Sequence, residues 1–258
     1  MWLTATTVRN LPLVVLDRAG LVTRARYRLY NGLTFECRSK TSDLAEVVVV
    51  CSGYEYPSAL VERLPPDAVV MDVGANIGAF CGFVHVHTRG KAYRGFAFEP
   101  FQKNVAVLRV NLAVNGINQF EVVETAISSV DGTVHLQADG PPDAVAVSAV
   151  PTGVQSESVR LSTFCQAHKI SWIHLLKMDV EGQEYEILED DLPFLTSHVS
   201  TLVVEFHPVQ GRDGQQWVRD RLSGAFDVEV WRSGGGSGIL IGRRKSRTPT
   251  IHPATTEC

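Results

Sequence analysis

The stretch from Val69 to Gly78 constrains the fold of this chain more than any other. An apolar run of strand type stops at Asp72, and a new apolar pattern begins at Ala79 after a turn that contains two glycines. This order predicts a buried parallel strand, a tight loop and the start of a helix. Gly74 and Gly78 lack a Cβ, so we expect a ligand to press against the loop backbone. The free N–H groups at the helix start favour an anionic ligand, which predicts a nucleotide-like cofactor in a Rossmann-type crevice.

Composition places the chain among globular proteins of enzyme size. Its 258 residues suit one large α/β domain with a short N-terminal addition, and 45% apolar residues supply a full core. The net charge of −4 argues against a nucleic-acid partner. The five cysteines show no CxxC pair, which is typical of reduced thiols rather than a disulfide framework or zinc site. No stretch resembles a signal peptide or a membrane span, so we expect a cytoplasmic protein without a membrane partner, and a homo-oligomer stays open.

The order of elements predicts an open sheet. Strands and helices alternate through most of residues 69–207, which predicts a parallel sheet with helices on both faces. Two final strands at 226–231 and 238–242 flank a glycine-rich turn and predict an antiparallel hairpin at the end of the sheet. We expect a main domain at residues 67–242 and a disordered polar tail at residues 243–258.

Residues 1–66 predict an extension in front of this sheet. Segments 24–30 and 33–38 flank Asn31-Gly32, which is a strong signal for a two-residue β-hairpin. A helix is expected within residues 8–21. A second helix follows Ser42 through residue 51, although its valine-rich composition leaves helix and strand in competition.

The residues at the strand ends narrow the choice of cofactor. The spacing Asp72-x-Gly74-x-Asn76-x-Gly78 lacks the third glycine of the GxGxxG dinucleotide fingerprint. Glu99 ends the second strand, where a carboxylate can accept hydrogen bonds from two ribose hydroxyls. The polar segments 126–128 and 177–182 should line the same edge of the sheet. An adenosine with a free ribose and a zwitterionic tail suits this lining, which indicates S-adenosylmethionine.

Five ordered blocks carry a resemblance to a known family. In the order and spacing of these blocks the chain resembles the FkbM-type methyltransferases from about residue 27 to residue 242. The blocks are Asp72–Gly78, Phe98–Pro100, Leu161–Phe164, Lys177–Glu184 and Val204–Pro208. The resemblance implies an α/β class I methyltransferase fold, a Rossmann-like three-layer sandwich whose mostly parallel seven-stranded sheet ends in an antiparallel hairpin. It also implies S-adenosylmethionine as methyl donor and O-methylation of a sugar or another natural-product intermediate.

The resemblance further implies which residues bind the donor. The glycine loop would border the methionine moiety, Glu99 would bind the ribose, and the residues that follow the second and third strands would lie near the adenosine. The donor residues expected in this way are Asp72, Gly74, Ala75, Asn76, Gly78, Glu99, Pro100, Asn104, Ala126 and Ile127.

The chemistry of the transfer calls for a base or a metal. Methyl transfer to an alcohol is an in-line displacement, and an alcohol is a poor nucleophile until its proton is removed. His207, directly after a core strand, is the best candidate base, with a histidine that merely caps the strand as an equal alternative. Asp179 and Glu205 end two strands that should be neighbours. They are candidates for catalysis or for holding Mg²⁺.

Three further residues are expected to contact the substrate. These are Lys177 and Glu181, beside Asp179, and Tyr56 in the loop before the nucleotide strand. The opposing interpretations are that Glu181 only favours the dipole of a following helix and that Tyr56 only packs the extension. A carboxyl or nitrogen acceptor, an NAD-type oxidoreductase and a non-catalytic binding module are the alternatives to an O-methyltransferase acting on a small hydroxylated molecule. The sequence does not specify the acceptor, because variable loops build acceptor pockets.

Overall fold

The computed structural model describes residues 2–137, 146–148, 153–209 and 211–246. A seven-stranded sheet with the order β12-β13-β11-β10-β3-β4-β5 forms its centre. Five strands run parallel: β3 (Ala68–Val73), β4 (Tyr93–Phe98), β5 (Phe120–Val123), β10 (Ile173–Met178) and β11 (Val199–Phe206). The antiparallel hairpin predicted at the end of the sheet is confirmed, and it consists of β12 (Phe226–Gly234) and β13 (Ser237–Arg244).

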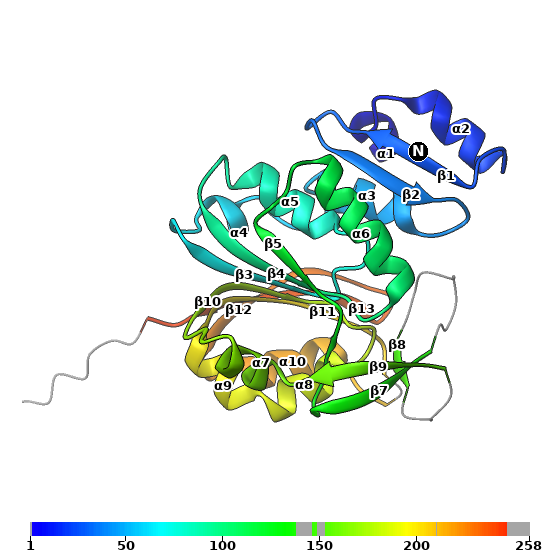
Figure 1. Ribbon diagram of the computed structural model, residues 1–258. Helices are drawn as coiled ribbons and strands as arrows, with labels where there is room; N and C mark the ends of the chain where they lie inside the picture. The colour runs from blue at the N-terminus through cyan, green and yellow to red at the C-terminus, as the bar shows by residue number, and fades with distance from the viewer. Residues whose placement is uncertain (1, 138–145, 149–152, 210, 247–258) are drawn as a thin grey trace, which may run out of the picture.

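Helices cover both faces of the sheet and make three layers (Figure 1). On one face lie α4 (Ala59–Glu62), α5 (Ala79–His87) and α6 (Gln102–Val114), and on the other α7 (Leu161–Ala167), α8 (Glu184–Asp190), α9 (Leu192–His198) and α10 (Gly214–Leu222). Side chains alternate between the two faces along a strand, so Val70 and Met71 of β3 belong to two different hydrophobic clusters. The predicted three-layer class I architecture is therefore confirmed, whereas α9 had no counterpart in the sequence analysis.

The order of the strands reverses between β3 and β10. From β3 the chain proceeds to β4 and β5 toward one edge, whereas β10 and β11 lie on the other side of β3. In an open α/β sheet, the crevice at the carboxyl ends of the strands beside such a reversal receives the ligand. The fold therefore predicts a ligand site at the segments that follow β3, β4 and β10.

The N-terminal residues form a hairpin that packs on the helix layer. β1 (Arg24–Arg28) and β2 (Thr34–Arg38) pair antiparallel, as Asn31-Gly32 predicted. The Oδ1 atoms of Asn111 in α6 and of Asn115, which directly follows α6, accept hydrogen bonds from backbone N–H groups of β2 at 2.7 and 2.8 Å. The hairpin therefore shares its hydrophobic cluster with the main domain.

Two expectations for the extension are decided by the structure. The valine-rich segment is a helix, α3 (Asp43–Cys51). A helix lies within residues 8–21 as predicted, α2 (Leu11–Arg18), and a further helix, α1 (Trp2–Thr7), precedes it. Val8, between the two helices, forms an antiparallel bridge with Leu29 of the hairpin, so α2 begins only at Leu11.

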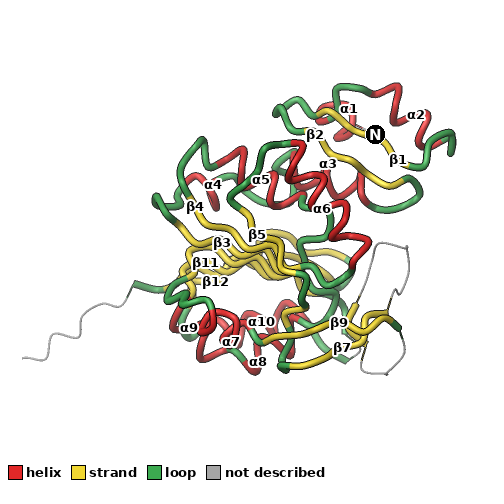
Figure 2. Tube along the Cα trace, in the orientation of Figure 1, coloured by secondary structure: helices red, strands yellow, loops and turns green. Residues whose placement is uncertain are grey.

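A second, smaller sheet follows β5 and leads back to α7. Figure 2 shows it to one side of the lower helix layer. Its strands in spatial order are β6 (Ala126–Ile127), β9 (Val154–Val159), β7 (Gly132–Gln137) and β8 (Ala146–Ser148). The strand β6 brings its two residues to the edge of the crevice.

The C-terminal strand extends beyond the predicted domain end. β13 includes Arg243 and Arg244, and the Nζ of Lys245 donates to the carbonyl oxygen of Ser223 at 2.7 Å. The remainder of the predicted tail, from residue 247, lies outside the described residues. None of the helices in the described ranges is long and apolar enough to cross a membrane.

Candidate active site

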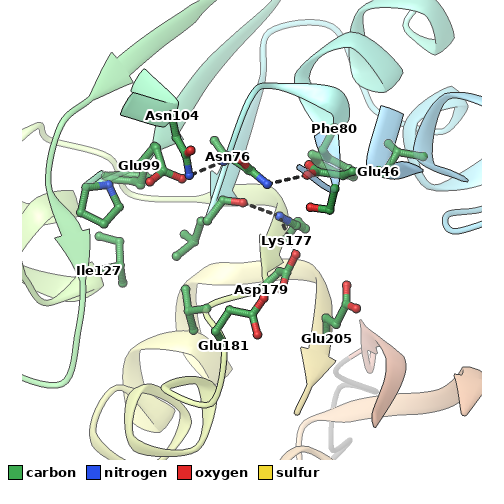
Figure 3. Close-up of a pocket in the computed structure, with 18 of the residues that line it drawn as sticks. Glu46, Asn76, Phe80, Glu99, Asn104, Ile127, Lys177, Asp179, Glu181 and Glu205 are labelled. Atoms are coloured by element: carbon green, nitrogen blue, oxygen red, sulfur yellow. Dashed lines mark hydrogen bonds and ion pairs between the residues drawn. The ribbon is translucent and has the colours of Figure 1, made fainter. Parts of the chain in front are cut away.

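A cavity of about 330 Å³ opens at the carboxyl ends of β3, β4 and β10. Its size lies within the usual range for small-molecule sites. In Figure 3, Glu99, Asn104 and Ile127 lie toward one end of the cavity, and Asp179 and Glu205 toward the other. All but two of the predicted site residues line it: Tyr56, Gly74, Ala75, Asn76, Glu99, Pro100, Asn104, Ala126, Ile127, Lys177, Asp179, Glu181, Glu205 and His207.

Asp72 lies beneath the glycine loop and not in the cavity. Its side chain is 0% exposed, with Oδ1 3.2 Å from the Nζ of Lys177 and Oδ2 accepting from the Sγ of Cys81 at 3.4 Å. The predicted contact of Asp72 with the donor is therefore corrected. Asp72 acts on the site through its ion pair with Lys177.

The two glycines of the loop make room for the protein itself. A Cβ on Gly74 would lie 1.8 Å from the carbonyl oxygen of Asp179, and one on Gly78 would lie 2.6 Å from the Cδ1 of Leu108. Both glycines adopt positive φ, +79° and +89°, which other residues rarely adopt. The missing Cβ atoms therefore serve the packing of the protein itself, and the contact of a ligand with the loop backbone stays a prediction. Gly78 begins α5 without lining the cavity.

Lys177 joins β10 to the glycine loop. Its Nζ donates to the carbonyl oxygen of Gly74 at 2.7 Å and lies 3.2 Å from Asp72 and 3.4 Å from Asp179. Burial lowers the pKa of Lys177, but the charges of Asp72 and Asp179 outweigh burial and raise it above its usual value. An ammonium group has three N–H donors, and three protein acceptors surround this one. The predicted role in substrate binding is therefore revised to positioning of the loop.

Glu99 occupies the end of β4 as predicted. Its Oε2 accepts the backbone N–H of Asn76 at 2.8 Å, and its Oε1 accepts that of Phe101 at 2.9 Å. Burial raises the pKa of Glu99 to about 7, and these two hydrogen bonds offset part of the effect. Each carboxylate oxygen has lone pairs left for a further donor, which suits two neighbouring hydroxyls.

Two buried amide oxygens mark the cavity as a place for a ligand with hydrogen-bond donors. Oδ1 of Asn76 and Oδ1 of Asn104 have no partner in the part of the chain that the structure describes. A buried acceptor without a partner is costly and rare. The ribose hydroxyls, adenine amino group and ammonium group of S-adenosylmethionine are donors of this kind. The residues present therefore fit that group.

The extension contributes a site residue that the sequence analysis did not select. Oε2 of Glu46, on α3, accepts the side-chain N–H of Asn76 at 2.5 Å. Burial raises the pKa of Glu46 well above its usual value. No local signal could have identified Glu46, since its partner lies 30 residues away and the contact exists only after α3 packs on the domain.

His207 is held by a buried carboxylate. Its Nδ1 lies 3.1 Å from Oε1 of Glu184, which also accepts the backbone N–H of His207 at 2.7 Å. Nε2 lies 3.7 Å from Asp179 and 3.5 Å from Glu181. Burial lowers the pKa of His207, but the hydrogen bond with Glu184 and the nearby carboxylates raise it to about 9. The imidazole is thus oriented by Glu184 toward the carboxylates of the cavity.

Glu205 lies at the same end of the cavity. Burial, together with the charge of Asp179, raises the pKa of Glu205 to about 8. Ligand atoms of Asp179, Glu205 and His207 all lie within 4.8 Å of one another, a spacing that a divalent cation could bridge. The hydroxyl of Tyr56 donates to Oε2 of Glu205 at 3.5 Å, while its ring packs edge-on against Phe80. Tyr56 therefore both packs the core and reaches the site.

The loop that carries Glu55 and Tyr56 is fastened to β12. The indole Nε1–H of Trp231 donates to the carbonyl oxygen of Glu55, and the guanidinium of Arg232 donates to that of Tyr54, both at 2.8 Å. A register shift in β12 between residues 230 and 232 marks a bulge at this place. Both strand residues thereby hold the loop over the carboxylate end of the cavity.

Comparison with known proteins identifies the family. A family model described as "Methyltransferase FkbM domain" matches residues 72–232, which include the glycine loop, Glu99 and the acidic strand ends. This chain belongs to the FkbM methyltransferase family. It is 31% identical over 186 residues to "31-O-demethyl-FK506 methyltransferase FkbM" of Streptomyces tacrolimicus, covering 59% of this chain and 70% of that protein. The FkbM chain is accordingly an S-adenosylmethionine-dependent methyltransferase, and the dinucleotide oxidoreductase alternative is set aside.

One solved structure supports the fold, and a second is reported for its similarity alone. A SAM-dependent methyltransferase from Agrobacterium tumefaciens matches with a TM-score of 0.50 at 10% identity, covering 87% of this chain and 70% of the other. Methyltransferase FkbM from Methylobacillus flagellatus KT matches with a TM-score of 0.49 at 16% identity, covering 78% of this chain and 53% of the other. The first match supports the class I methyltransferase architecture described above.

Proposed function

We propose that this FkbM methyltransferase transfers a methyl group to a hydroxyl of a small metabolite, most simply a sugar or a glycosylated natural-product intermediate. The observation that carries the proposal is the Glu184–His207 pair, whose Nε2 faces the carboxylates of the cavity beside the glycine loop. The relative from Streptomyces tacrolimicus is named for a 31-O-demethyl compound, which supports oxygen as the acceptor atom here.

Each part of the cavity has a defined task in this reaction. S-adenosylmethionine supplies the methyl group on a sulfonium, and the carbon–sulfur bond breaks as the carbon–oxygen bond forms. Glu99, Asn76 and Asn104 hold the donor by their free acceptor positions. His207 accepts the hydroxyl proton at Nε2 once that atom is unprotonated, and Glu184 keeps the ring oriented.

A divalent cation between Asp179 and Glu205 is the second way to activate the hydroxyl. Such an ion would lower the pKa of a bound alcohol without a base. The 4.8 Å grouping with His207 is the observation in its favour. Loss of activity after exhaustive chelation, restored by Mg²⁺ or Mn²⁺, would support this route, and full activity after chelation would exclude it.

An acceptor screen tests the proposed reaction. Purified protein and S-adenosylmethionine are incubated with hydroxylated, carboxylated and amine compounds, and mass spectrometry detects the gain of one methyl group. We expect methyl transfer to hydroxylated compounds, and NMR of the product should show the new methyl carbon bonded to oxygen. A methyl ester or an N-methyl product would refute O-methylation.

A further inference from the structure

More carboxyl groups than cationic side chains line the cavity in the described part of the chain. Six carboxylates line it: Glu46, Glu55, Glu99, Asp179, Glu181 and Glu205. Lys177 and His207 are the cationic side chains among the described residues that line it. Lys177 is shared with buried Asp72, and His207 with buried Glu184, so neither cation is left to neutralise the lining carboxylates fully.

Four of these carboxylates, Glu55, Asp179, Glu181 and Glu205, form what we call the acidic wall. Asp179 is its centre, because its charge acts on each of the other three. Burial and the charge of Asp179 raise the pKa of Glu55 to about 7 and that of Glu205 to about 8, and the nearby cations offset only part of the rise. The guanidinium of Arg232, one of the cations that act on Glu55, donates to the carbonyl oxygen of Tyr54 and lies 3.7 Å from the centre of the Tyr54 ring.

A separate observation, independent of the acidic wall, indicates that a ligand binds in the cavity. Asn104 is 3% exposed, lines the same cavity, and its Oδ1 has no partner among the described residues. The donor itself carries one net positive charge, from a sulfonium, an ammonium and a carboxylate. Bound donor therefore balances only part of this excess of carboxyl groups, and the remaining carboxyl groups of the wall favour a cationic group in whatever else occupies the cavity.

Building on the proposed function, we propose that the hydroxylated acceptor carries a positively charged amino group, as an amino sugar or a comparable amino alcohol does, and that the acidic wall selects it. An ammonium group offers a charge and several N–H donors to neighbouring carboxylates. It has no free lone pair while it is protonated, so the hydroxyl remains the nucleophile. Carboxylated and phosphorylated acceptors are repelled by the same wall.

Three sugars with one ring skeleton test this selection: glucosamine, glucose and glucuronate. Each is titrated at pH 7, where the amino group of glucosamine is mostly protonated, by saturation-transfer NMR into the full chain with S-adenosylhomocysteine bound. We expect glucosamine to bind at least about tenfold more tightly than glucose, the ratio of one strong charge contact, and glucuronate to bind weakest. Equal binding of glucose and glucosamine, or no binding by any of the three, would overturn the assignment.

Two variants and a titration in the presence of Mg²⁺ extend the test. Glu55→Gln should reduce the preference for glucosamine at least about threefold. Glu121→Gln, an exposed carboxylate on β5, should leave it unchanged. If Mg²⁺ displaces glucosamine and raises the affinity for glucose above it, the wall is a metal site and the proposal fails.

Failure of this inference is distinguishable from failure of the proposed function. Methyl transfer to oxygen on neutral and amino sugars alike would refute the selection by charge and leave O-methylation intact. A methyl group found on nitrogen would refute O-methylation, whatever the order of binding affinities.

Discussion

At the scale of single residues, His207 depends on its partner Glu184. Because the pKa of His207 is raised to about 9, most molecules carry an imidazolium at neutral pH. If this group is the base, kcat should rise with pH up to about 9, since only the unprotonated ring can accept the hydroxyl proton. Initial rates across pH 6–10 with a responsive acceptor measure this profile.

Two variants separate His207 from its neighbours. His207→Gln should lower kcat by about 10²–10⁴ and change donor affinity little. In Glu184→Gln, the rise of kcat with pH should occur at lower pH, because the negative partner that stabilises the imidazolium of His207 is removed. If kcat of His207→Gln still rises with pH near 8, the group that accepts the hydroxyl proton is instead Glu205, whose pKa is raised to about 8.

Gly74 offers a second prediction at this scale. Gly74→Ala should abolish binding of S-adenosylhomocysteine in calorimetry and destabilise the protein, because the new Cβ would lie 1.8 Å from the carbonyl oxygen of Asp179. Gly116→Ala is the matched control, since φ is also positive, +64°, and nothing lies within 4 Å of its Cβ position. The control should cost about 1 kcal/mol in chemical denaturation and leave binding intact. Equal behaviour of the two variants would show that only backbone conformation matters.

At the scale of elements, the bulge in β12 positions the loop of residues 52–57. Trp231→Phe removes the hydrogen bond to Glu55 while keeping an aromatic ring. One hydrogen bond contributes about 0.5–1.5 kcal/mol, so KM for the acceptor should rise about 2- to 10-fold. Affinity for S-adenosylhomocysteine should not change. Steady-state kinetics and calorimetry measure the two quantities.

The control for this element is Trp2→Phe, at a tryptophan that is 78% exposed and distant in sequence from the loop. It should change neither quantity. A Trp231→Phe enzyme with unaltered acceptor KM would show that the loop holds its position without the bulge. A loss of donor affinity alone would place the loop over the other end of the cavity.

At the scale of the whole molecule, the cavity links stability to pH. Burial raises the pKa of Glu55 and Glu99 to about 7 and that of Glu205 to about 8, from 4.5 in the unfolded chain. The folded protein therefore binds these protons more tightly than the unfolded protein does. Stability should be highest near pH 5 and should fall as the pH rises through 7–8. His207 extends the decline toward pH 9, from 6.5 in the unfolded chain.

Melting temperatures of the ligand-free protein between pH 5 and pH 9 test this linkage. We expect the melting temperature to fall by more than about 4 °C, which is the shift that a loss of ~1–2 kcal/mol in the free energy of unfolding produces in a domain of this size. His87 and His174, whose pKa values burial lowers, act in the opposite sense near pH 6. The double variant Glu55→Gln/Glu205→Gln should flatten the profile. A melting temperature that rises over the whole range would contradict the shifted carboxylates.

The sequence by itself determined the architecture and most of the residues that line one end of the cavity. Apolar periodicity and the strand-loop-helix at residues 69–78 specify local structure, and strand ends such as Glu99 follow from that structure alone. Even here, the family resemblance implied direct donor contact for Asp72, which the packing of Lys177 and Cys81 places beneath the loop. Whether a side chain is buried or ion-paired depends on residues that are close in space but distant in the sequence, and a local pattern does not contain them.

Only the tertiary structure decided the charge state and the walls of the cavity. Glu46 reaches Asn76 because α3 packs on the domain, and Trp231 reaches Glu55 across 176 residues. His207 becomes a strong base because folding places Glu184 beside it, and the carboxylates form the acidic wall because separate strands end at one edge. Such effects depend on distance through space, which falls to a few ångströms only when the sheet and its helices assemble.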